Sequence, residues 1–71
     1  MSGWLVSVGW HQWKGDILAG SALCVLTLAD DQGALTELVC TDGVRRDARS
    51  LVGEYVATKA ERGVVVEVTR P

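Results

Sequence analysis

The sequence predicts one small, mainly β domain, a five-stranded barrel with one short helix between its third and fourth strands. Three observations lead to this fold class. The 71 residues are enough for a single domain (1–71), and with 48% hydrophobic and 23% charged residues the chain has the composition of a folded protein. Glycine-bearing turn signals at 14–16, 29–33, 41–43 and 61–63 divide it into five segments. Four of the five segments have the residue pattern of strands.

The first strand is predicted from strict alternation over residues 4–10. One face would carry the apolar side chains of Trp4, Val6, Val8 and Trp10. The other face would carry Ser7, Gly9 and His11. A period of two with one apolar face is typical of a half-buried strand, so we expect the tryptophan and valine face to lie against the core.

The next two strands form a predicted hairpin. Residues 22–29 are apolar on both faces except at Thr27, as in a central strand. The short connection 30–33 leads to a second apolar segment, 34–41. Asp30 and Asp31 lie in this turn, where carboxylates commonly accept hydrogen bonds from nearby backbone, and we assign them that role rather than a catalytic one. The last strand is the β-branched segment 64–70.

The segment 45–62 allows two interpretations. One is a helix over 47–62, which would make the domain α+β with the order β-β-β-α-β. The other is a short helix over 45–52 that ends at Gly53, followed by a strand that turns at 61–63 into the last one. We favour the second, because Gly53, Val52 and Tyr55 are poor helix formers.

With this choice the chain resembles the OB-fold, a five-stranded Greek-key barrel with a helix between strands three and four. The stretch LTLADDQGALTELVC (26–40) is similar to the hairpin of its second and third strands. LVGEYVATKAERGVVVEV (51–68) resembles its fourth and fifth strands, and VSVGWHQWKG (6–15) is similar to the first strand of the RNA-reading OB domains of some tRNA synthetases. The resemblance implies a binding module and single-stranded nucleic acid as a ligand.

Two groups of residues are candidate ligand contacts. Trp10, His11 and Trp13 cluster at the end of the first predicted strand. An indole there would stack on a base or sugar while His11 adds a hydrogen bond. In the alternative interpretation, Trp10 belongs to the core and Trp13 covers the end of the barrel or a subunit contact.

Arg45, Arg46 and Arg49 are the second candidate group and the one basic cluster in the sequence. Guanidinium groups match phosphate oxygens, so this cluster would clamp a nucleic-acid backbone. The alternative is a solvated helix face with Asp47 among the arginines.

The sequence indicates no enzyme, no cofactor and no metal site. Its single histidine makes a catalytic triad an improbable arrangement. Cys24 and Cys40 lie in apolar segments without metal-ligand spacing, as small buried hydrophobes of a reducing compartment. The apolar run 17–29 is too short to span a membrane, and the N-terminus lacks the basic start of a signal peptide. We therefore expect a cytoplasmic protein without membrane contact.

The sequence leaves two hypotheses for the function of this protein. The first is a non-enzymatic, self-assembling or protein-interaction module, with a homo-oligomer or another protein as the partner. The second is a single-stranded nucleic-acid-binding module that uses Trp13, His11 and the arginine cluster. The net charge of −2 is unusual for a nucleic-acid binder and favours the first.

Overall fold

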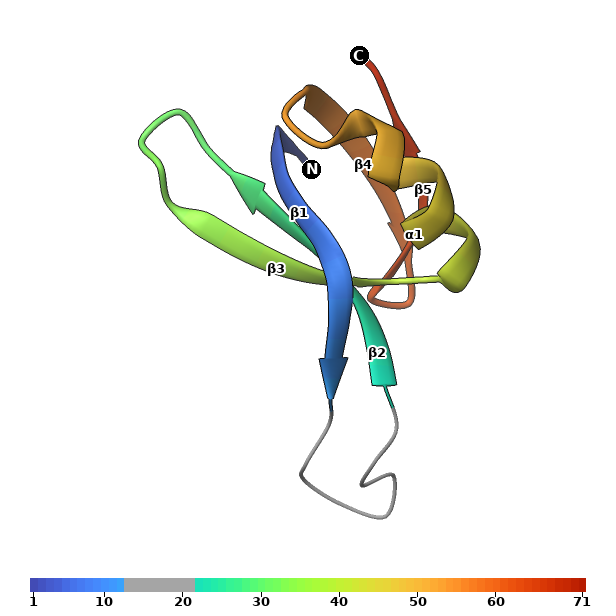
Figure 1. Ribbon diagram of the computed structural model, residues 1–71. Helices are drawn as coiled ribbons and strands as arrows, with labels where there is room; N and C mark the ends of the chain where they lie inside the picture. The colour runs from blue at the N-terminus through green and yellow to red at the C-terminus, as the bar shows by residue number, and fades with distance from the viewer. Residues whose placement is uncertain (13–21) are drawn as a thin grey trace.

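The computed structural model describes residues 1–12 and 22–71 of the chain, with the backbone alone for residues 10–12, 22 and 23 (Figure 1). Its elements are β1 (Ser2–Gln12), β2 (Ala22–Ala29), β3 (Leu35–Cys40), α1 (Asp42–Ala48), a 3-10 turn η1 (Arg49–Leu51), β4 (Tyr55–Glu61) and β5 (Val64–Thr69). The strands form a closed barrel in the order β1-β2-β3-β5-β4. All neighbours are antiparallel except β3 and β5.

The predicted fold class is confirmed: the protein is a mainly β, OB-like barrel with one short helix between β3 and β4. The alternative of a helix over 47–62 is wrong, because β4 begins at Tyr55. Gly53 ends the helical segment with φ 93°, a conformation that glycine adopts without steric cost. Its N–H donates to the Leu5 carbonyl at 2.8 Å, which ties this connection to β1. In the part of the chain that the structure describes, no helix has the length and apolar character needed to cross a membrane.

The helix begins earlier than predicted. The sequence predicts a turn at 41–43, but α1 already starts at Asp42 and includes Gly43. The reason is the N-cap: the Thr41 hydroxyl oxygen accepts a hydrogen bond from the Val44 N–H at 3.2 Å. The cap satisfies a backbone donor that the first turn of a helix leaves free, so the glycine two residues later does not prevent the helix.

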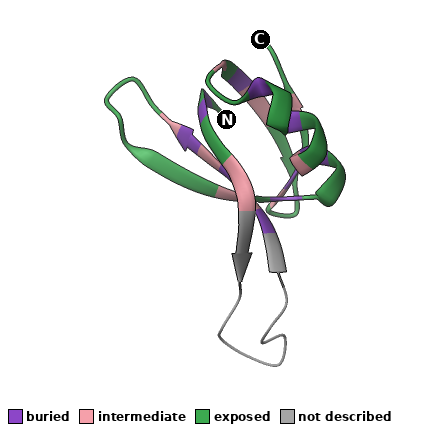
Figure 2. Cartoon of the chain, viewed as in Figure 1, coloured by how far each residue is buried: buried purple, intermediate pink, exposed green. Residues whose placement is uncertain are grey.

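The predicted core face of β1 is wrong at Trp4 and Val6 and confirmed at Val8. Leu5 is fully buried, whereas Trp4 and Val6 are 47% and 46% exposed. The cause is a β-bulge: Leu5 pairs with Leu28 and Ser7 with Thr27, which leaves Val6 as the extra residue. The bulge shifts the alternation by one position, so that Val8 again packs against the core. Figure 2 shows the change along β1 from exposed to half-buried residues.

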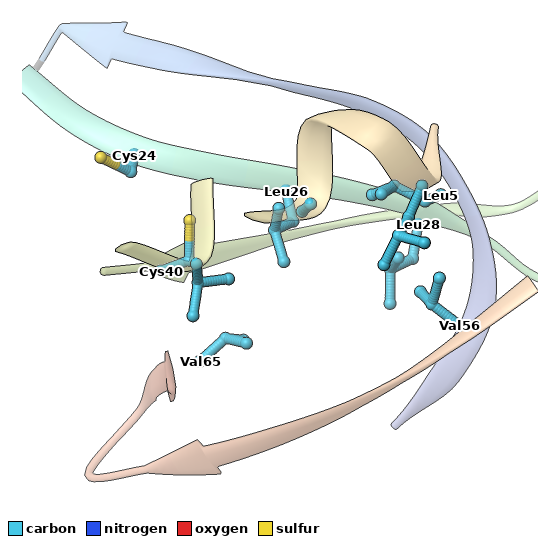
Figure 3. Close-up of a cluster of buried hydrophobic side chains, with 10 residues drawn as sticks. Leu5, Cys24, Leu26, Leu28, Cys40, Val56 and Val65 are labelled. Atoms are coloured by element: carbon cyan, nitrogen blue, oxygen red, sulfur yellow. The ribbon is translucent and has the colours of Figure 1, made fainter. Parts of the chain in front are cut away.

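The core lies inside the barrel and is entirely apolar (Figure 3). Its largest fully buried side chains come from four strands, namely Leu5, Leu26, Val56 and Val65. The helical segment covers one opening of the barrel with three buried residues, Val44, Ala48 and Leu51. Cys24 and Cys40 are buried and free, as predicted. Burial of these side chains is the main source of stability in so small a domain.

Both predicted hairpin turns are confirmed. In the β2–β3 turn, Asp30 Oδ1 accepts from the backbone N–H groups of Gln32 at 2.8 Å and Ala34 at 2.9 Å. In the β4–β5 turn, Arg62 and Gly63 have φ values of 54° and 81°, the signature of a two-residue type I′ hairpin loop.

Two contacts close the barrel. On one side, Ser2 to Trp4 of β1 pair with Ala57 to Tyr55 of β4. On the other, β3 and β5 share one register pair in the described chain, Cys40 with Val65, next to a hydrogen bond from the Thr41 N–H to the Val65 carbonyl at 3.2 Å.

Candidate functional site

The outer surface of the barrel carries a row of apolar side chains that crosses four adjacent strands. Register pairs join Leu35 of β3 to Ala29 of β2, Ala29 to Trp4 of β1, and Trp4 to Tyr55 of β4. Side chains of paired residues project from the same face of a sheet. We call these four residues the outer row. Because Leu5 and Val56 point into the core, their chain neighbours Trp4 and Tyr55 point outward.

Aromatic contact fixes the centre of the outer row. The rings of Trp4 and Tyr55 meet edge to face, with centroids 5.2 Å apart and an interplanar angle of 74°. This geometry is favourable for two aromatic quadrupoles and holds both rings in one orientation. The two residues nevertheless remain 47% and 40% exposed, and Leu35 is 63% exposed. The row is thus a preorganised surface with a large apolar area still open to solvent.

An ion pair borders the outer row. Glu54, the residue before Tyr55, accepts two hydrogen bonds from Arg70, from Nε to Oε1 at 2.6 Å and from Nη2 to Oε2 at 3.0 Å. The hydrogen bonds from Arg70 lower the pKa of the Glu54 carboxyl and, reciprocally, raise the pKa of the guanidinium. This bidentate ion pair fixes a polar group at the residue that precedes Tyr55 in the chain.

The predicted arginine cluster lies on α1 and η1, away from the tip of the β2–β3 hairpin (Figure 1). Arg45 and Arg46 both contact Asp42: Arg45 through Nε at 3.1 Å and Nη2 at 3.0 Å, and Arg46 through Nε at 3.6 Å. The hydrogen bond to Asp42 raises the pKa of the Arg45 guanidinium above its ordinary value. Arg49 is exposed and forms no ion pair with the described residues. The structure therefore brings two of the three arginines together on one carboxylate.

The predicted aromatic cluster falls mostly outside the described residues. The backbone of β1 pairs Trp10 with Cys24 and His11 with Leu23. The side chains of Trp10 and His11, and all of Trp13, lie outside the described part of the chain. Their role as stacking residues stays a prediction.

Comparison with protein-family models, curated proteins and solved structures found no significant match to this chain. Within residues 1–12 and 22–71, no group of three or more His, Cys, Asp or Glu side chains could hold a metal ion. The choice of the outer row as the candidate site therefore rests on the geometry of these residues alone. Sequence reasoning missed Trp4 and Tyr55 as surface residues, although each directly precedes a β-branched or aliphatic residue that faces the core.

Proposed function

We propose that this protein is a non-enzymatic protein-interaction module that self-assembles through the outer row. The observation that carries the proposal is the exposed Trp4–Tyr55 pair, aligned by strand register with Leu35. Tryptophan and tyrosine are the side chains that most often dominate the binding energy of protein interfaces. Their fixed orientation lowers the entropy lost when a partner docks.

The border of the outer row supports a protein partner over a nucleic acid. An interface commonly consists of an apolar centre and a polar rim, and we assign the Glu54–Arg70 pair, which begins one residue before Tyr55 in the chain, to that rim. A phosphate backbone would instead need unpaired cations near the aromatic rings. Glu37 projects from the same outer face of β3 as Leu35, two positions along the strand, and adds negative charge there.

Sedimentation of the full chain over micromolar to millimolar concentrations tests the proposal. We expect the average mass to rise with concentration, and we expect Leu35→Arg to abolish that rise by placing a desolvated charge in the interface. Val66→Arg is the matched control, because Val66 is also a partly exposed apolar residue but lies on β5, outside the outer row. A monomer mass at every concentration, or equal effects of the two variants, would refute self-assembly through the outer row.

Single-stranded nucleic-acid binding through Trp13, His11 and the arginine cluster is the second candidate. The supporting observation is the OB-like strand order, on which oligonucleotide-binding barrels are built. Tryptophan fluorescence during titration with short DNA and RNA strands, at low salt and at about 200 mM, tests it. A saturable, salt-sensitive change that the triple substitution of Arg45, Arg46 and Arg49 removes would support it. No change at either salt concentration would contradict it.

A further inference from the structure

The two cysteines are neighbours across the sheet. Cys24 of β2 and Cys40 of β3 are direct register partners, although sixteen positions separate them in the chain. Both side chains belong to the buried cluster, so both project into the barrel. Figure 3 shows them at the same end of that cluster, on adjacent strands. Two free thiols therefore lie on neighbouring strands, on the inner side of the sheet.

The hydrogen-bond pattern gives their spacing. Asp30 and Ala34, at the hairpin end, form a hydrogen-bonded pair through the Asp30 N–H and the Ala34 carbonyl at 3.0 Å. Hydrogen-bonded and non-hydrogen-bonded pairs alternate along antiparallel strands, so Cys24 and Cys40, three such repeats away, are again a hydrogen-bonded pair. The Cα atoms of such pairs are about 5.5 Å apart, within the range that a disulfide spans. Their Cβ atoms, at the wide end of about 4.5–5.5 Å, must approach by about 1 Å for the bond to form, which strains the disulfide and makes it easily reduced.

The surroundings of the two thiols differ. Cys24 Sγ lies 3.9 Å from Asp42 Oδ1, the oxygen that also accepts from Arg45. For Cys40 the dominant influence is burial, which together with the neighbouring Cys24 raises the pKa of its thiol to about 11. At neutral pH Cys40 is thus a neutral thiol.

We propose that Cys24 and Cys40 are a redox-sensitive pair that forms a reversible disulfide across β2 and β3 when a small peroxide reaches the end of the barrel. Cys24 Sγ attacks one oxygen of hydrogen peroxide, which forms an S–O bond and breaks the O–O bond. The second oxygen leaves as water with the thiol proton. Cys40 Sγ then attacks the Cys24 sulfur, forms the S–S bond and displaces the hydroxyl as a second water. Two thiols are oxidised and one peroxide is reduced to two waters.

The order of the two steps follows from the difference between the thiols. Burial raises the pKa of the Cys40 thiol to about 11, so little Cys40 thiolate is present to attack the peroxide, and Cys24 takes the first step. Cys40 reacts second because its attack is intramolecular, where proximity offsets the low fraction of thiolate. A dithiol reductant reverses the reaction by thiol–disulfide exchange.

The test treats the full chain with hydrogen peroxide, then denatures it, alkylates the remaining thiols and measures the intact mass. We expect a monomer that has lost two hydrogens and takes up no alkylating agent, and full recovery of both thiols after dithiothreitol. Two remaining thiols, oxygen adducts, or a disulfide between chains would overturn the proposal.

A matched control separates the inner-face geometry from mere closeness in sequence. In the double variant Cys40→Ala with Val39→Cys, the second thiol moves by one residue to a position whose side chain is 37% exposed on the outer face. The sheet then lies between the two sulfurs, and we expect no internal disulfide while the circular dichroism spectrum stays that of a β-barrel. Internal disulfide formation in this variant at the wild-type rate would refute the register argument.

Discussion

Replacing Gly3 by alanine tests how tightly the barrel closes. A Cβ at Gly3 would lie 2.9 Å from the Ala29 carbonyl oxygen and 3.4 Å from the Leu28 Cβ. Separations under 3.0 Å are essentially never found for real Cβ atoms, and the obstructing atom is backbone, so β1 or β2 must move. Neither is free to move, because β1 pairs with β2 and β4 at this point. Such overpacking costs about 1–3 kcal/mol, and we expect about 2 kcal/mol for Gly3→Ala.

Two other glycines provide controls with the opposite expected sign. A Cβ added at Gly9 of β1 or at Gly43 of α1 would have no atom within 4 Å, and neither residue has a positive φ. Alanine at either site restricts the unfolded chain without strain in the folded one, so we expect stabilisation of about 0.4–1 kcal/mol. Gly9→Ala is the closer match, because it lies on the same strand as Gly3.

Urea unfolding followed by tryptophan fluorescence measures all three variants. Gly3→Ala should shift the midpoint to lower urea at an unchanged m-value, and in a domain of this size each kcal/mol also shifts the Tm by about 4–8 °C. A Gly3→Ala variant as stable as Gly9→Ala would show that β1 and β2 separate without cost. It would refute the inference that the two strands lie too close at Gly3 to admit a Cβ.

Three further predictions concern the turns and the core. Asp30→Ala should destabilise the protein by about 1 kcal/mol in urea unfolding, since two backbone N–H groups lose their acceptor, whereas Asp31→Ala should have little effect. Gly63→Ala should cost about 1 kcal/mol by the same measurement, because φ is 81° there; an unchanged midpoint would contradict the type I′ turn. The folded-state pKa of Cys40 is raised from 9.0 to about 11, so the stability it contributes is complete below pH 9 and falls as the pH rises toward 11. The free energy of unfolding, measured by urea titration through that pH range, should fall less steeply in Cys40→Ala. The difference between the two proteins should reach on the order of 2 kcal/mol at the upper end of the range.

The fold was predictable because turns and strands in this chain are set by local chemistry. Asp30 and Gly33 specify one hairpin and Arg62–Gly63 the other, and both were visible as turn signals. The start of the helix was harder to predict from the sequence, because Asp42 followed by Gly43 is as typical of a turn as of the first turn of a helix. Only the Thr41 side chain, bonded to the Val44 N–H, decides between them.

The orientation of β1 could not be read from alternation. A bulge adds one residue without changing the apolar or polar character of the sequence, so Trp4 and Val6 look like core residues in the pattern. The pairing of Trp4 with Tyr55 is long-range and depends on barrel closure. For this reason the outer row emerged from the structure, whereas the arginine cluster was found from the sequence.

In the described part of the chain, β3 and β5 share a single register pair, so the barrel resists opening less at this contact than at the others. Opening there leaves one open sheet in which β3, β2, β1, β4 and β5 keep their other pairings. Such partial openings need less free energy than global unfolding and dominate the exchange of amide hydrogens with solvent. The Thr41 amide, bonded across this contact, should therefore exchange before those of β2. Cys40 lies beside it, so the rate at which its thiol meets a reagent measures how often the barrel opens.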